Sequence, residues 1–227
     1  MTSNSEKSNG PVEVASDSRR AGLLFVFGGL LFLLLTTVSE AVYPNFSLQT
    51  NAISDLAAVG TSSTIIEGIA LLGLGASWTL GAYYLFRNGG RRRTTILSLL
   101  PGVGYLLAGL SPENVNIIIH SSGAPLAFVV GSIVAVLSYR KIQSLFRYFA
   151  LALGSLSIAS TFVIFVGGQL VGPCGTCAGP VYAQRLEALG LGLGGWESMI
   201  IYPLMAWLIG YGSYLLGQSG QAERRKN

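Results

Sequence analysis

Apolar residues run along the chain in six long blocks, with short polar segments between them. Each block is continuously apolar and does not alternate, unlike a strand of a membrane β-barrel. A helix needs about 20 apolar residues to cross the hydrocarbon core, where it must satisfy its own backbone hydrogen bonds. The pattern therefore predicts an all-α, polytopic membrane bundle of six transmembrane helices. Their approximate ranges are Ala21–Ser39, Ile65–Phe86, Thr94–Leu110, Ile117–Tyr139, Tyr148–Val171 and Trp196–Leu216.

The composition supports a membrane protein. Apolar residues make up 51% of the 227 residues and charged residues only 11%, whereas a soluble domain has about 25% charged residues. A net charge of +4 could suggest a nucleic-acid partner. The basic residues stand instead in short clusters between the apolar blocks, which is typical of membrane topology. We therefore expect membrane lipids as partners, and no nucleic acid.

The basic residues also predict the orientation, because short cytoplasmic loops retain positive charge. With the amino terminus inside, Arg185 is the only one of the 14 Lys and Arg residues that falls outside. This split predicts a plasma-membrane protein with an even number of spans and both termini in the cytoplasm. The residues on the inner side are Lys7, Arg19, Arg20, Arg87, Arg91, Arg92, Arg93, Arg140, Lys141, Arg147, Arg224, Arg225 and Lys226.

The predicted domain organisation is a transmembrane domain of residues 20–217 between two cytoplasmic tails. Residues 1–19 are polar and low in aromatic residues, as in a disordered tail, and residues 218–227 form a basic tail. The first apolar block is longer than the core of a cleaved signal peptide, so we expect it to remain as a helix. The two long outer loops are expected to carry short interfacial helices, near 51–59 and 181–189.

Six of the ten acidic residues fall on the predicted outer side. Helices that run inward begin there, and the helix dipole stabilises a carboxylate in the first turn by roughly 0.3–1 kcal/mol. Thr64 and Glu67 also have the spacing of a capping box. Ser111 and Pro112 before Glu113 are typical of a helix start. Helix capping therefore accounts for Glu67, Glu113 and Glu197, but not for every ionisable residue on this side.

Glu40, Asp55 and His120 have no such explanation. An ionisable group at membrane depth is costly and usually faces the bundle interior or a water-filled cavity. A histidine paired with a carboxylate can act as a proton relay or general base. We therefore hypothesise an outer site in which Asp55 and His120 are catalytic or proton-handling, while Glu40, Glu113 and Glu197 help to bind a ligand. A solvated histidine near the interface is the alternative.

Cys174 and Cys177 form a C-x-x-C pair in the second outer loop. The predicted compartment is oxidising, so a disulfide is expected. It could be a local clasp or a redox centre linked to quinone; the absence of a second cysteine pair favours the clasp. Two Cys and one distant His leave a tetrahedral metal site incomplete. With no nucleotide or catalytic motif in the sequence, we expect no metal and no cofactor.

Pro101, Gly102 and Gly104 interrupt the third apolar block. Such residues kink a transmembrane helix or allow a neighbouring helix to approach closely. Close packing is therefore the expected role of this segment, and Pro125 is expected to bend the following helix.

Three groups of residues carry a resemblance to a known family. They are Tyr43-Pro44 with Asn51–Leu56, then Gly109–Glu113 with His120, and then Trp196-Glu197 with Tyr202-Pro203 and Trp207. The chain resembles the DUF998 family of archaeal and bacterial multi-pass membrane proteins over about residues 20–217. The resemblance implies the six-helix order.

The resemblance also implies that Asp55, Glu113, His120 and Glu197 match motif positions of the family, whose activity is uncharacterised. The chain departs from the family pattern at Ala57, where Gly is expected, and at Ser198, where a basic residue is expected. The second departure leaves Glu197 without an expected ion-pair partner.

The function is therefore predicted only by class. The first hypothesis is a membrane protein with a polar Asp/His/Glu cavity at the outer face that handles protons or binds a small molecule or lipid at the outer leaflet. The alternatives are a membrane-embedded lipid-modifying enzyme and a small-solute transporter or structural scaffold. The lack of predicted charge in the inner halves of the helices counts against a charged transport pathway.

Overall fold

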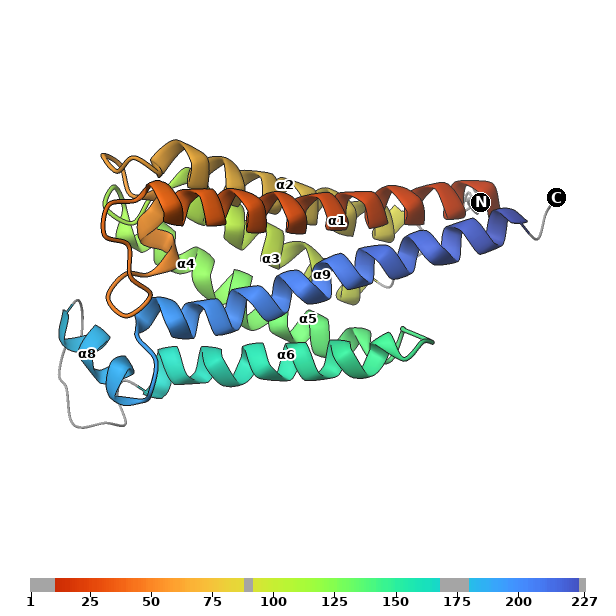
Figure 1. Cartoon of the computed structure of the whole chain (residues 1–227). Helices are drawn as coiled ribbons and strands as arrows, with labels where there is room; N and C mark the ends of the chain where they lie inside the picture. Colours follow the sequence, from red (N-terminus) through yellow and green to blue (C-terminus); the bar gives the residue numbers. More distant parts are fainter. Residues whose placement is uncertain (1–10, 88–91, 168–179, 225–227) are drawn as a thin grey trace, which may run out of the picture.

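The computed structural model describes residues 11–87, 92–167 and 180–224, which form helices and turns without a strand (Figure 1). The all-α prediction is confirmed for this part of the chain. Five helices are long and apolar enough to cross a membrane, and a sixth apolar helix, Ile96–Leu110, is shorter. The five are Ser16–Val42, Thr64–Arg87, Ile117–Ser138, Phe146–Val166 and Leu193–Gln221.

The secondary-structure elements follow the predicted blocks closely. Helices α4 and α5 form one span with a π-helical segment, η2, directly after Pro125, where a bend was predicted; π-helical insertions are a known cause of helix bending. The short elements in the two long loops are the 3₁₀ helix η1 and helix α8, near the two predicted interfacial helices. The bounds are α1 Pro11–Val42, η1 Ile53–Ala57, α2 Thr64–Arg87, α3 Arg92–Leu110, α4 Ile117–Pro125, η2 Leu126–Val130, α5 Gly131–Ser138, α6 Phe146–Phe162, η3 Val163–Gly167, α8 Pro180–Ala188 and α9 Leu193–Arg224.

The long helices pack as a closed ring. Helix α1 lies between α2 and α9, α3 packs on α2 and on α4–η2, and α6 joins α5 to α9. Both termini lie at one end of the bundle, and η1 and α8 lie at the other (Figure 1). We call the first the basic end, because Arg20, Arg87 and the α5–α6 turn with Arg140 and Lys141 lie there, and the second the loop end. The predicted orientation would place the basic end in the cytoplasm.

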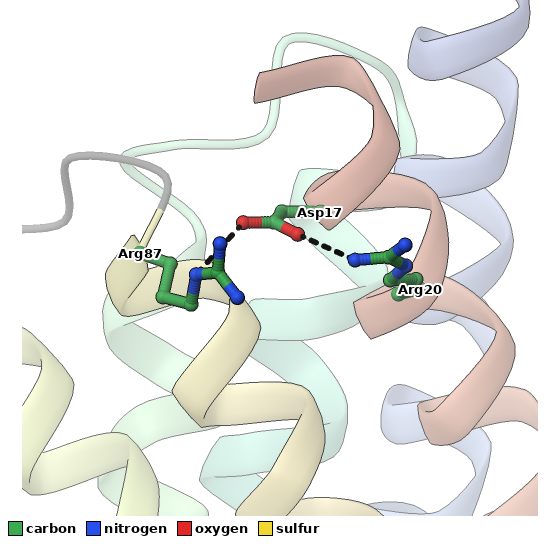
Figure 2. A network of polar contacts seen from close by, with 3 residues as sticks. All are labelled: Asp17, Arg20 and Arg87. Atoms are coloured by element: carbon green, nitrogen blue, oxygen red, sulfur yellow. Dashed lines mark hydrogen bonds and ion pairs between the residues drawn. The ribbon is translucent and has the colours of Figure 1, made fainter. Parts of the chain in front are cut away.

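Helix α1 begins at Pro11, so residues 11–19, predicted as part of a disordered tail, are helical. Asp17 is only 1% exposed, and its carboxylate lies 3.4 Å from Arg20 Nη1 and 3.5 Å from Arg87 Nε (Figure 2). The ion pair to Arg87 joins the start of α1 to the end of α2. This contact spans 70 residues of sequence, which is why local composition did not predict the extra helical turns.

The backbone of helix α3 packs directly against the backbones of α2 and α4, as its Pro-Gly segment predicted. A Cβ added to Gly75 of α2 would lie 2.8 Å from the carbonyl oxygen of Gly102, and one added to Gly123 of α4 would lie 2.5 Å from that of Gly104. Both distances are shorter than a carbon can tolerate. Only glycine therefore allows the short α3 to fit between α2 and α4 at this distance.

A string of aromatic side chains crosses the middle of the bundle. Trp78 of α2 lies 5.7 Å, between ring centroids, from Trp207 of α9 and 6.0 Å from Tyr105 of α3. Tyr105 in turn lies 6.2 Å from Phe32 of α1. All four side chains are at most 2% exposed. We call this set the aromatic layer; it separates a cavity at the loop end from a cavity at the basic end.

Candidate functional site

A small cavity lies at the loop end, between α1, α2, α3, α4, η1 and α9. Its volume is about 40 Å³, and most of its lining is apolar. Four ionisable side chains also line it, namely Glu67, Tyr105, His120 and Glu197. A cavity needs a volume of about 10–15 Å³ to hold one water molecule. This space, the outer cavity, therefore holds a few waters or a small ion and is too small for a lipid chain.

Glu67 is fully buried near the start of α2. Its Oε1 accepts a hydrogen bond of 3.1 Å from Thr36 Oγ1 on α1, and its Oε2 has no hydrogen-bond partner in the described part of the chain. The predicted capping box is wrong, because the Thr64 hydroxyl donates to the carbonyl oxygens of Ala58 and Thr61 instead. Glu67 points across to α1 and does not cap its own helix.

The signal for this placement was in the sequence. Glu67, Leu71, Leu74 and Trp78 recur at helical spacing, and all four are buried on the same face of α2. The helix dipole explains why a carboxylate is tolerated in the first turn of α2. The helical spacing shows which way the Glu67 side chain points, namely toward the bundle interior. Glu67 is thus a site residue that was assigned to capping.

Glu197 of α9 is 8% exposed and also reaches the outer cavity. Its Oε2 accepts a hydrogen bond of 2.5 Å from the backbone N–H of Ile53, the first residue of η1. The carboxylate therefore fixes the loop that contains η1 to α9. Ser198, which stands where a basic residue was expected, donates 2.7 Å to the Gly194 carbonyl within its own helix.

His120 of α4 is buried, with 8% of its surface exposed, and lines the outer cavity. Its Nδ1 lies 3.1 Å from the carbonyl oxygen of Ser111. A carbonyl oxygen only accepts hydrogen bonds, so Nδ1 is the donor and Nε2 of the neutral ring keeps its lone pair. Such a nitrogen can accept a proton or a hydrogen bond inside the outer cavity.

Helix α4 starts at Ile117, the first residue of the predicted span, and not at the predicted cap Ser111. Asn116 caps it by accepting 3.1 Å from the Ile119 N–H. Ser111, Pro112 and Glu113 belong to the preceding turn, so Glu113 is not in a first helical turn. Instead Ser54 Oγ donates to Glu113 Oε2 at 3.4 Å, which ties this turn to η1.

Asp55 lies beside the outer cavity and does not line it. Its Oδ2 accepts hydrogen bonds from the Ala52 N–H at 3.0 Å and from Asn51 Nδ2 at 3.4 Å. Its carboxylate therefore stabilises the start of η1. With Glu113 it lines a separate, shallow depression on the surface, and no described contact joins it to His120.

Glu40 also lies apart from the outer cavity. It sits at the end of α1, and its Oε1 accepts 3.1 Å from the Tyr202 hydroxyl of α9. Of the five residues predicted for the site, the structure thus brings His120 and Glu197 into one cavity. Asp55 and Glu113 share the surface depression, and Glu40 bridges two helices.

The outer cavity contains two polar atoms that the protein leaves without partners. Glu67 Oε2 and the Tyr105 hydroxyl are both buried, and neither has a hydrogen-bond partner among the residues that the structure describes. Nearly all buried polar groups in proteins are hydrogen-bonded to protein or water. The two atoms therefore mark positions for water or for another small hydrogen-bonding species.

Residues 11–87, 92–167 and 180–224 contain no group of three His, Asp or Glu that could hold a metal ion. Cys174 and Cys177, the predicted disulfide, lie outside the described residues. The site as described is a set of ionisable side chains in an apolar wall.

The fold and the site together define the class of this protein. It is a helical membrane protein, with apolar helices long enough to cross a bilayer and buried ionisable residues at one end of the bundle. The chain belongs to the DUF998 family, described as a protein of unknown function, whose model matches residues 26–214. The match confirms the resemblance and includes every residue that lines the outer cavity. No curated protein and no solved structure matches the chain.

Proposed function

We propose that this protein crosses the plasma membrane six times, with both termini in the cytoplasm, and that its outer cavity takes up and releases protons on the outer side. Helix α3 supports the sixth crossing, since its 19 residues rise about 28 Å at 1.5 Å per residue. This length is close to the hydrocarbon thickness of about 30 Å. The shared position of the termini and the basic residues at that end support the orientation.

The observation that carries the proton-handling role is the pair of buried, unpartnered atoms in the outer cavity. The Glu67 carboxyl is bound at one oxygen by Thr36 and interacts with the buried Ser39 hydroxyl, but neither its second oxygen nor that hydroxyl makes a hydrogen bond of normal geometry among the described residues. A carboxyl group buried in this way is stabilised by a proton or a cation. The described lining contains no Lys or Arg that could supply the charge. The described residues also contain no group of three His, Cys, Asp or Glu that could hold a metal ion, which favours a proton as the occupant.

Each side chain then has a role in the proposal. Glu67 carries the proton, and His120 exchanges it through Nε2 as a general base. The Tyr105 hydroxyl and the waters that the cavity can hold connect these groups. Glu197 supplies a second carboxylate and keeps η1 over the cavity through Ile53. Asp55, Glu113 and Glu40 hold the surrounding loops and do not exchange the proton.

The other classes of function fit the geometry less well. A lipid-modifying enzyme, or a lipid ligand at the outer leaflet, needs a cleft wider than the outer cavity. A transporter for solutes needs a path past the aromatic layer, whose side chains pack at centroid distances of 5.7–6.2 Å. A purely structural scaffold gives no reason for two unpartnered polar atoms in one cavity.

Infrared spectroscopy on the protein in nanodiscs tests the proposal. A protonated carboxylic acid in an apolar site has a C=O stretching band separate from those of the peptide groups. We expect such a band, which changes with external pH, to be lost in Glu67→Gln and shifted in His120→Ala. Glu187→Gln on the exposed face of α8 is the matched control and should leave it unchanged. A pH-dependent band that persists in Glu67→Gln, or the lack of any such band in the wild type, would overturn the assignment.

A further inference from the structure

A second and larger cavity lies at the basic end. Its volume is about 390 Å³, within the range of roughly 300–1,000 Å³ that ligand-binding pockets occupy. It lies between α1, α2, α3, α5 and α9, below the aromatic layer, and we call it the inner cavity. It plays no part in the proton-handling role proposed for the outer cavity.

The walls of the inner cavity are aromatic and aliphatic. Trp78 Nε1 donates 3.1 Å to the Ser98 carbonyl, and Trp207 Nε1 donates 2.9 Å to Ser138 Oγ. The protein thus uses both indole N–H groups itself, so the two rings offer the cavity only apolar surface. Leu137, which also lines it, is 39% exposed and adds an aliphatic side chain to these walls.

Two cations stand at one edge of these apolar walls. Arg140 and Lys141 form the turn after α5, are exposed, and line the inner cavity. No acidic residue is among its described lining residues, and no described carboxylate pairs with either cation. The contrast with Asp17 is clear, since that carboxylate is shared by Arg20 and Arg87 at the same end of the bundle (Figure 2).

We propose that the inner cavity binds an anionic membrane lipid. Its phosphate lies at Arg140 and Lys141, and one of its acyl chains lies between Trp78 and Trp207. The combination of an apolar interior with charge only at the rim matches an amphiphile and does not match a soluble anion. The predicted cytoplasmic position of this end also faces the leaflet in which anionic lipids concentrate and where basic residues attract them.

Tryptophan quenching in nanodiscs tests this proposal. The chain has three Trp residues, so Trp196→Phe leaves emission only from the two in the cavity wall. We compare doxyl-labelled phosphatidylglycerol with doxyl-labelled phosphatidylcholine of the same acyl chains. The anionic lipid should quench at a several-fold lower mole fraction. Arg140→Gln with Lys141→Gln should weaken this preference by about fivefold or more, given the usual contribution of each basic residue.

Arg19→Gln with Arg147→Gln removes the same charge from outside the inner cavity and should preserve the preference. Val134→Phe, which fills the cavity without changing charge, should reduce quenching by both lipids. Equal quenching by the two lipids in the parent protein, or a preference that survives loss of Arg140 and Lys141, would overturn the proposal. Displacement of the lipid by inorganic phosphate alone would also overturn it, because the site would then recognise a free anion.

Discussion

The two cavities of this protein differ in almost every physical property, although they share one wall. The outer cavity is about 40 Å³ and contains two carboxyl groups, a histidine and a tyrosine; the inner cavity is about 390 Å³ and has cations only at its rim. Trp78 lines the inner cavity and contacts Tyr105, which lines the outer one. The difference teaches that volume and the position of charge, taken together, indicate the occupant. A small space with internal acids suits a proton, and a large apolar space with external cations suits a lipid.

The largest effect is expected from a substitution that removes the side chain between the two cavities. Trp78→Ala should lower the free energy of unfolding by about 3–5 kcal/mol, because a fully buried Trp leaves a large cavity. The inner and outer cavities should then connect. Thermal unfolding in detergent measures the loss of stability. Tyr83→Ala is the matched control, since Tyr83 lies on the same helix but is 47% exposed and should have a much smaller effect. Similar losses for the two variants would show that Trp78 is not a wall between cavities.

A smaller change isolates the outer cavity. Thr36→Val removes the 3.1 Å hydrogen bond to Glu67 and keeps the side-chain shape, while the neighbouring Ser39 hydroxyl stays in place. Leaving a buried polar group without its hydrogen-bond partner costs about 1–3 kcal/mol, so stability should fall by an amount in that range. The neighbouring Thr37→Val provides the control, because Thr37 is exposed and bonds only to the Leu33 carbonyl of its own helix. Equal unfolding temperatures for the two variants would contradict a special role for the Glu67 contact.

The smallest expected effect concerns the basic end. Asp17→Asn weakens ion pairs to Arg20 and Arg87, whose side chains are 54% and 39% exposed. Pairs of this exposure contribute at most about 1 kcal/mol each and are screened by salt. The loss of stability should therefore be about 1 kcal/mol and should shrink as salt is added. A salt-independent loss would mean that packing of α1, and not charge, fixes this end.

The sequence predicted the helices well because membrane spans depend on a simple local property. Continuous apolar residues must be helical in a bilayer wherever they occur. The start of α1 was missed because Asp17 is held by Arg87, 70 residues away, and no local pattern reveals such a partner. Glu67 differs, because its helical spacing with Leu71, Leu74 and Trp78 does indicate the buried face of α2. Only its partner Thr36, 31 residues away, has no local signal.

The start of α4 shows a third kind of difficulty. Ser111 and Asn116 are both good capping residues, and the choice between them depends on other elements. Asn114 exchanges two hydrogen bonds with the Val59 backbone, and the Ser111 carbonyl accepts from His120. These contacts hold residues 111–115 in a turn. His120 thus lines the outer cavity, as predicted for a site residue. Asp55 does not line it, because its carboxylate bonds to the backbone at the start of η1.

The aromatic layer has an electrical consequence. Water can occupy both cavities, but the rings of Trp78, Tyr105 and Phe32 form a dry region between them. In the proposed orientation, most of the membrane voltage falls across that dry region. A charge that crosses the whole membrane gains or loses about 2.3 kcal/mol per 100 mV, but a proton that stops at Glu67 crosses little of the field. Proton binding in the outer cavity should therefore report the pH outside the cell and be nearly blind to the membrane potential.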